Sequence, residues 1–307
     1  MRRSSQIEAG VHTWVRHTHY NSHSPVATVS RFSVGFGARL GLCHTPRLEQ
    51  DFHRGNTVSD TISFAQEAGI ATLSFEHPER RNALGATELD AIETALSQID
   101  NTTRVLMITA SDDRTFCAGA DLNQILEGVL DGDRFQSVTN QIAALPIPTV
   151  AVLSGNVYGG GVELAMSCDF RLAREGISFR IPAAAIGLCY PIAGIQRLTR
   201  RLGVTVAKRL LVAAETLSTE QLLALRLIDA VYSPDQLRGV ATEYATSLLA
   251  LAPMAVTNML EVIRQLELGE LDLDAANSLA KACSESQDVK EGISAQREKR
   301  VPVFKNQ

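Results

Sequence analysis

Three consecutive glycines followed closely by one acid constrain this chain more than any other feature. They lie in SGNVYGGGVELAMSCD, residues 154–169, between the apolar run TVAVLS and the helix-like stretch VELAMS. A glycine inside a regular element costs about 0.5–1 kcal/mol relative to alanine, so the bare backbone needs another explanation. At a helix N-terminus the first backbone N–H groups lack partners within the helix and favour negative charge. The run therefore predicts a strand-to-helix turn that holds an oxyanion.

The segment FCAGADL, residues 116–122, repeats this arrangement with a strand, the small-residue turn AGA and a helix beginning at Asp121. Two such turns on neighbouring parallel strands would each direct one N–H group at the same oxygen. Paired donors of this kind stabilise an enolate or a tetrahedral oxyanion, and loss of one typically costs about 100–1000-fold in rate. Either turn alone is explained as well by a cap or by close packing, but the pair favours an oxyanion site.

Glu163 lies one turn inside the helix that follows the glycines. A carboxylate there can move a proton at the carbon next to an activated carbonyl or can activate a water. It is equally explained as a first-turn acid that interacts with the helix dipole. His77 is the only histidine after residue 60, which disfavours a Ser-His-Asp hydrolase. The glycine spacing also differs from the GxGxxG and GxxxxGK[ST] nucleotide motifs.

The composition is that of an ordinary soluble globular protein, with 45% hydrophobic residues, 21% charged residues and a net charge of −5. This balance indicates neither a nucleic-acid partner nor a membrane partner. The five cysteines are an odd number without CxxC spacing, which favours free thiols over a disulfide frame. We therefore expect no metal site.

Residues 1–60 form an N-terminal extension without sustained helical or alternating periodicity, and they hold six of the seven histidines and no lysine. Three interpretations stay open: a start codon assigned too far upstream, with Val58 as the true start; an organellar transit peptide; or a disordered extension. We expect a cytoplasmic enzyme, or one of the mitochondrial matrix if the extension is a transit peptide.

From residue 61 the chain alternates between strands and helices and then becomes helical, which predicts an α/β core over 61–254 and a helical region over 255–307. Strands are predicted at 70–76, 104–110 and 149–154, and helices at 86–99, from 121, at 133–144, 194–202, 205–213, 218–225, 234–250, 253–268 and 271–297.

Five segments together resemble the crotonase superfamily, also called the enoyl-CoA hydratase/isomerase family, over about residues 62–307. They are SFEHPERRNAL, FCAGADL, SGNVYGGGVELAMSCDFRLA, IPAAAIGLCYPIAGIQRL and EGISAQREKRVPVFK. The resemblance implies an α/β superhelix of repeated ββα units with a helical C-terminal trimerisation region, assembled as a trimer or a dimer of trimers. It implies acyl-CoA substrates and no cofactor beyond the coenzyme A of the substrate.

The resemblance also implies roles for individual residues. The N–H groups of Ala120 and Gly160 would hold the thioester oxygen, and Glu163 matches the first of the two glutamates used by enoyl-CoA hydratases. Substrate contacts would come from Ala118, Asp121, Ala183 and Tyr190, and the coenzyme A phosphates would meet Arg81 and Lys299.

One departure from the family pattern bears on the chemistry, because Ala183 stands where true hydratases have their second glutamate. Syn addition of water needs one group to activate the water and one to protonate the α-carbon. Either Glu163 performs both transfers or another side chain substitutes. The candidates are Tyr190, as first choice, and Cys189, Arg180 and Tyr158.

Two further departures are Gln296, in place of an aromatic residue that meets the adenine, and Arg226, in place of a turn glycine. Arg226 would cost stability if the turn needs a positive φ. We expect an enoyl-CoA hydratase or isomerase that stabilises a thioester enolate. The alternatives are a dedicated 3-enoyl-CoA double-bond isomerase and a non-catalytic acyl-CoA-binding protein.

Overall fold

The computed structural model describes residues 56–306, which all belong to one compact unit. The three interpretations of the N-terminal extension concern residues that lie almost entirely outside this range. Strand β1 (Asn56–Ser59) pairs antiparallel with β2 (Ile62–Glu67), and its register is irregular between Thr57 and Ser59. The folded part thus begins before residue 61, because an edge strand this short shows no readable alternation in the sequence.

The main sheet has seven strands in the order β1-β2-β3-β5-β8-β10-β13. Strands β1 to β3 are antiparallel, and all later neighbours are parallel. Every residue of β5 and β8 is buried, as expected for parallel strands covered on both faces. The later strands are β3 (Ile70–Phe75), β5 (Val105–Ala110), β8 (Thr149–Leu153), β10 (Phe170–Arg174) and β13 (Ala230–Tyr232).

A second sheet lies in the order β12-β11-β9-β6 and consists of short strands that periodicity does not reveal. These are β6 (Thr115–Cys117), β9 (Asn156–Tyr158), β11 (Ser178–Arg180) and β12 (Leu217–Ser218), and β4 (Ala83–Leu84) pairs separately with β7 (Gly119–Ala120). Each of β5, β8 and β10 is followed by one strand of this sheet and then by a helix, with the short strand β7 before α2 and the turn η2 before α5. This succession is the repeated ββα unit, and the predicted α/β fold with C-terminal helices is confirmed.

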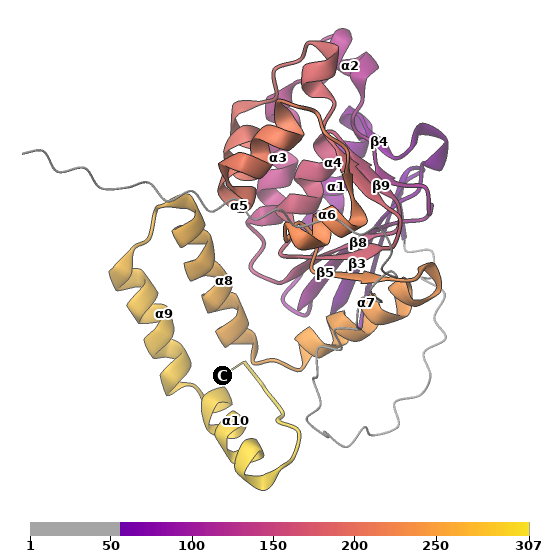
Figure 1. Cartoon of the computed structure of the whole chain (residues 1–307). Coiled ribbons are helices and arrows are strands. Elements are labelled where there is room, and N and C mark those ends of the chain that lie inside the picture. Colours follow the sequence, from indigo (N-terminus) through magenta and orange to yellow (C-terminus); the bar gives the residue numbers. More distant parts are fainter. Residues whose placement is uncertain (1–55, 307) are drawn as a thin grey trace, which may run out of the picture. The chain divides into compact units, whose positions relative to one another are not determined.

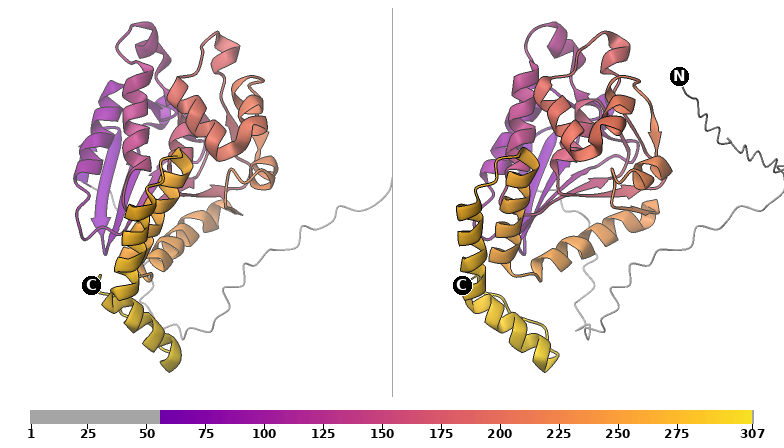
Figure 2. Two further views of the ribbon diagram at one scale, coloured as in Figure 1. Left: turned by 90° about the vertical axis from the view of Figure 1, so that its left-hand side faces the viewer. Right: turned by 60° about the vertical axis from the view of Figure 1, so that its left-hand side comes forward.

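The helices cover both faces of the main sheet, with α1, α3, α4 and α5 on one side and α7 on the other (Figures 1 and 2). Two predicted helices form the single element α5, interrupted at Gly203 by non-helical backbone, and the last predicted helix is divided at Ser286. The bounds are α1 (Ala86–Ser97), α2 (Leu122–Leu126), α3 (Gly132–Ala143), α4 (Gly160–Ser167), α5 (Ile192–Leu211), α6 (Thr219–Ala224), α7 (Pro234–Leu249), α8 (Pro253–Leu268), α9 (Leu273–Glu285) and α10 (Gln287–Glu298), with 3-10 turns η1 (Pro78–Arg80) and η2 (Ala183–Ile186).

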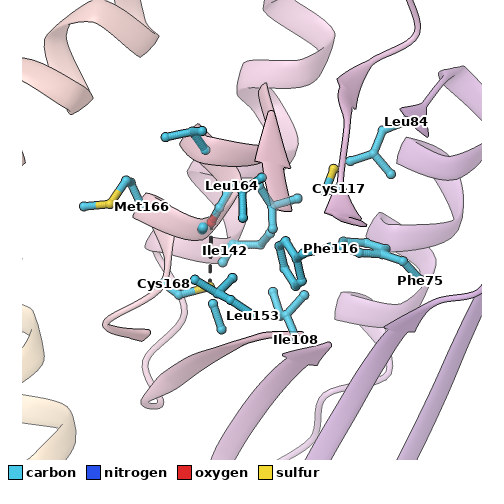
Figure 3. Close-up of a cluster of buried hydrophobic side chains, with 14 of the residues drawn as sticks. Phe75, Leu84, Ile108, Phe116, Cys117, Ile142, Leu153, Leu164, Met166 and Cys168 are labelled. Carbon is cyan, nitrogen blue, oxygen red and sulfur yellow. Dashed lines mark hydrogen bonds between the residues drawn. The ribbon is translucent and has the colours of Figure 1, made fainter. Parts of the chain in front are cut away.

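The larger hydrophobic core lies between the two sheets and the helices α1 to α5. Phe75 and Phe116 meet edge to face within it, with ring centroids 5.4 Å apart, and Ile108, Leu153 and Leu164 pack around them (Figure 3). Each side chain of this size contributes roughly 1.5–3 kcal/mol on burial. This packing fixes the ends of β6 and β9, where the site is built.

The C-terminal helices are tied to the α/β body through arginines. Arg201 of α5 bonds Glu267 of α8 at 2.7 Å and the Cys168 carbonyl at 2.9 Å, while Arg264 donates to the Leu145 carbonyl at 3.1 Å. Helix α9 packs on α8, and α10 packs on α9. Over residues 56–306 no single helix is long and apolar enough to cross a membrane, although the bent pair α7 and α8 meets that length and composition when taken together.

Candidate active site

The two predicted strand-to-helix turns lie against each other. They follow β6 and β9, which are parallel neighbours in the second sheet. Gly119, in the first turn, has φ +85°, and a Cβ on it would lie 2.5 Å from the backbone nitrogen of Gly160 in the second turn. Gly160 is the first residue of α4, so its N–H group has no partner within the helix. Only glycine at position 119 permits this approach.

Each member of the glycine run has its own reason to lack a side chain. Gly159 adopts φ +52°, which favours glycine. A Cβ on Gly160 would lie 2.5 Å from the ring of Phe135, and a Cβ on Gly161 would lie 2.5 Å from the Cys117 carbonyl. The run therefore allows α4 to begin in direct contact with both α3 and the end of β6.

The connector HPERRN holds the first turn from the other side. Asn82 is buried, donates to the carbonyls of Thr115 and Phe116, and accepts from the His77 N–H at 2.9 Å. The carbonyl of Arg81 accepts the Ala118 N–H at 3.0 Å. Arg81 itself has φ +54° and an exposed side chain. Its contact with coenzyme A phosphates stays a prediction.

Asp121 supports the same turn. Its N–H donates to the Leu84 carbonyl, and its carboxylate caps α2 by accepting the N–H of Asn123 at 2.9 Å. The carboxylate also forms an ion pair with Arg80. These bonds orient the residues on either side of Ala120, so Asp121 has a structural role whether or not it contacts a substrate.

Glu163 lies in the first turns of α4 and is 1% exposed. Its Oε1 accepts from Gln136 Nε2 at 2.6 Å and from Thr139 Oγ1 at 3.3 Å, both on α3. Its Oε2 accepts from the Tyr190 hydroxyl at 2.9 Å. The guanidinium of Arg197, on α5, lies 3.7 Å from Oε1. The two carboxylate oxygens therefore have different surroundings.

Burial raises the pKa of Glu163 above its ordinary range, while the Tyr190 hydrogen bond, the Arg197 charge and the two α3 donors oppose that rise. Burial also raises the pKa of Tyr190 well above its ordinary value, and the neighbouring Glu163 charge adds to the effect. Tyr190 thus remains a protonated donor at neutral pH. The carboxyl of Glu163 is a better proton acceptor than an exposed one.

Ala183 begins η2 and is buried, so a methyl group lies at the position that the resemblance assigns to a second glutamate. Of the substitutes suggested by the sequence, Tyr190 contacts Glu163 directly. Arg180 instead donates to the Ala214 carbonyl at 3.3 Å, and Cys189 is exposed. Tyr158 ends β9 at the glycine turn. Tyr190 is thus the substitute that the structure brings to the acid.

Sequence reasoning missed three partners of Glu163, namely Gln136, Thr139 and Arg197. A signal was present on α3, because Gln136 and Thr139 lie on its buried face beside Phe135 and Val138. Polar residues in a buried stripe need partners, and an acid is a suitable one. The position of Arg197 opposite Glu163 follows only from how α5 packs.

Lys299 lies at the C-cap of α10 with φ +56° and an exposed side chain. Its expected contact with coenzyme A stays a prediction. Within residues 56–306 no group of three or more His, Cys, Asp or Glu side chains is arranged to hold a metal ion.

The fold consists of repeated ββα units, and a buried acid lies beside two strand-to-helix turns that contact each other. These features define a crotonase-type α/β enzyme. The family model described as enoyl-CoA hydratase/isomerase matches residues 65–307, and the chain belongs to that family. The crystal structure of an enoyl-CoA hydratase from Bacillus anthracis is similar with a TM-score of 0.73 at 28% identity, and the match covers 80% of this chain and 100% of that one.

Two curated relatives illustrate the range of reactions in the family. A crotonyl-CoA hydratase from Syntrophomonas wolfei is 32% identical over 256 residues, which cover 80% of this chain and 98% of that protein. A methylmalonyl-CoA decarboxylase from Escherichia coli is 27% identical over 245 residues, which cover 76% of this chain and 94% of that protein. The predicted family and the prediction of an enzyme are confirmed.

Proposed function

We propose that the enzyme hydrates or isomerises enoyl-CoA thioesters, with the N–H groups of Ala120 and Gly160 on the thioester oxygen and Glu163 as the only catalytic carboxylate. The observation that carries the proposal is the pairing of a buried, hydrogen-bonded Glu163 with two strand-to-helix turns in contact. Donors at the thioester oxygen stabilise the enolate, which is the species that both reactions share.

The surroundings of the carboxylate support Oε2 as the reacting oxygen. Oε1 accepts from Gln136 and Thr139 and faces Arg197, so three groups hold it. Oε2 accepts only from Tyr190 among the bonds described for residues 56–306. A base needs a lone pair that points to the substrate, and Oε2 retains one.

Hydration with one carboxylate proceeds in two steps. Oε2 of Glu163 takes a proton from water while the water oxygen bonds to the β-carbon and the electron pair of the double bond moves to form the enolate. A proton then returns to the α-carbon, either from Glu163 itself or from Tyr190, which Glu163 reprotonates. Both routes add one water and leave the enzyme unchanged.

Isomerisation fits the same residues. Glu163 would remove a proton from the α-carbon of a 3-enoyl thioester and return it to the γ-carbon, which requires one acid–base group. Buried Ala183 favours this reaction over a two-carboxylate hydration.

Parallel assays on crotonyl-CoA and on a 3-enoyl-CoA test the proposal and separate its two reactions. Hydration removes the ultraviolet absorbance of the conjugated thioester, and isomerisation of the 3-enoyl substrate creates it. We expect Glu163→Gln to lower either rate at least about 100-fold, with exposed Glu127→Gln as the matched control. Full activity of Glu163→Gln would rule out its assigned role. Tight binding of both thioesters without turnover by wild type would favour a non-catalytic binder.

Decarboxylation of a malonyl-type thioester is a second candidate, favoured by the single carboxylate and by the Escherichia coli relative. In this reaction the bond to the carboxylate carbon breaks, carbon dioxide leaves and the electron pair remains as the same enolate. No base is needed, and only a proton donor such as Tyr190 must reach the α-carbon. Release of carbon dioxide from methylmalonyl-CoA, in the absence of crotonyl-CoA hydration, would select this reaction.

We also propose that the enzyme assembles through its C-terminal helices. Met259, Ile263 and Leu266 of α8 are 58–59% exposed and recur at helical spacing, so they form one apolar stripe. A stripe of this kind suits burial against another copy. Sedimentation of wild type and of Ile263→Glu measures the assembly, and a wild type that stays monomeric at micromolar concentration would contradict it.

A further inference from the structure

We propose that Arg197 is a positioning residue that keeps Glu163 ionised and fixes its Oε1, so that Oε2 is left to act as the base. The inference rests on the proposed role of Glu163. Arg197 would act on the reaction through the carboxylate that it faces.

The contact between the two groups is one of charge and not a hydrogen bond. Arg197 Nε lies 3.7 Å from Glu163 Oε1, which is beyond hydrogen-bond range. This Nε is buried and finds no hydrogen-bond partner among residues 56–306. A buried donor without a partner is costly, so its retention beside the acid needs a compensating role.

Helix α3 also holds the guanidinium. A second nitrogen of Arg197 donates to Asn140 Oδ1, and the side chain is only 11% exposed. Asn140 lies one turn beyond Gln136, which donates to the same Oε1 of Glu163. Helix α3 therefore fixes both the acid and its counter-charge, and the distance between them is set by backbone packing.

The other groups around this pair are few. Tyr190 donates to the second oxygen of Glu163, and the α3 side chains at its first oxygen carry no charge. Arg201 and Glu267 act on Arg197 with opposite signs. Arg197 is thus the cation that faces the carboxylate directly.

The role predicts a definite direction in pH. A positive charge next to a carboxyl lowers its pKa, and burial of Glu163 raises it. Loss of the Arg197 charge must therefore raise the pKa of Glu163, by about one unit or more for a partly buried pair. Since the base is the carboxylate, a variant without the Arg197 charge should lose activity on acidification at a higher pH than wild type does.

Infrared titration measures this pKa without turnover, because the difference spectrum between wild type and Glu163→Gln isolates the Glu163 carboxyl band. We expect Arg197→Met to raise its titration midpoint by about one unit or more. Arg197→Lys, which keeps the charge, should stay within about half a unit of wild type. Arg209→Met is the matched control, since it removes an arginine charge from the same helix at a partly buried ion pair with Glu215.

An unchanged midpoint in Arg197→Met, or equal shifts in the Met and Lys variants, would overturn the proposal. If Arg197→Met does not fold, Asn140→Leu removes the acceptor that holds the Arg197 guanidinium. The Glu163 midpoint of that variant should rise by a smaller amount, and an unchanged midpoint would also overturn the proposal. The acid limb of kcat/KM should move with the infrared midpoint. A shifted midpoint in a protein without turnover on any thioester would leave the pairing intact and count against the proposed function alone.

Discussion

The hydroxyl of Tyr190 lies 2.9 Å from Oε2 of Glu163 and donates to it. Tyr190 comes from the loop before α5, seven residues after Ala183 in the chain, and its pKa is raised well above the ordinary value by burial and by the acid. A protonated phenol is thereby held at Oε2, the oxygen that we propose as the base. Under the proposed function, this pair would carry out the proton transfers that two carboxylates divide in a two-glutamate hydratase.

Tyr190→Phe tests whether the hydroxyl takes part in proton transfer. We expect kcat on the preferred thioester to fall about 100-fold, in line with the loss of one general acid–base group. The acid limb of the pH–rate profile should also move to higher pH, because the Tyr190 hydrogen bond lowers the pKa of Glu163. Steady-state kinetics across pH measure both effects.

Tyr232→Phe removes a hydroxyl from strand β13 and is the matched control. If Tyr190→Phe shifted the acid limb but kept kcat, Tyr190 would be a positioning residue only. If neither quantity changed, the hydroxyl would have no role in the reaction.

Glu163→Gln should stabilise the protein at neutral pH and not at acidic pH. The folded pKa of Glu163 is raised, so the fold favours its protonated form. The resulting stability is fully present below the unfolded pKa of about 4.3 and is lost as pH rises through the folded pKa. Glutamine does not titrate, and each unit of pKa difference corresponds to about 1.4 kcal/mol.

Urea unfolding of wild type and Glu163→Gln at several pH values measures this difference. The free energy of unfolding of Glu163→Gln minus that of wild type should grow from about pH 4 upward and become constant above the folded pKa of Glu163. Exposed Glu127→Gln should show no such growth. A gap between wild type and Glu163→Gln that is independent of pH would mean that the pKa of Glu163 is not raised.

Gly119→Ala tests the contact between the two turns. Its Cβ would lie 2.5 Å from the Gly160 nitrogen, so the backbone that presents the Gly160 N–H must move. We expect at least about a 100-fold loss in kcat, comparable to the loss of one oxyanion donor. Gly128→Ala is a close control, because Gly128 also has a positive φ, of +70°, but its Cβ would meet nothing within 4 Å.

Both alanine variants should lose stability from the left-handed backbone, by about 1–2 kcal/mol. Only Gly119→Ala should lose activity. Equal activity of the two variants would show that the approach of Gly119 to Gly160 does not matter for the reaction.

How far the sequence predicts this site depends on whether a constraint is local. Gly160 and Gly161 lack side chains because α4 begins against Phe135 and Cys117. The resulting glycine run is visible in the sequence without knowledge of the fold. Glu163 is recognisable by its place in the same helix. Three strands of the main sheet and the longer helices were likewise predicted from periodicity within a few residues.

The contacts of Gln136 and Arg197 with Glu163 were not predicted, because these two residues come from other helices. Gln136 and Arg197 lie 27 and 34 residues away in the chain, and only the packing of α3 and α5 on α4 brings them to Oε1. The short strands β9 and β11 were also missed, since strands of three residues are too brief to show alternation. The fold's second sheet thus came from the family resemblance and not from pattern.

Arg226→Gly should stabilise the enzyme without altering its activity. Arg226 follows α6 and has φ +59°. Arg226 stands in place of a family glycine and was expected to cost stability if the turn needs a positive φ, and the turn does need one. A side chain in this left-handed region costs roughly 1–2 kcal/mol, and glycine removes that cost. Glycine also increases the conformational entropy of the unfolded chain, which opposes the gain, so the free energy of unfolding should rise by about 0.5–1 kcal/mol. Arg226→Ala keeps the Cβ and should give no gain. Urea unfolding midpoints measure both variants, and equal stability of the two would mean that the arginine side chain, and not its backbone, decides the balance at this turn.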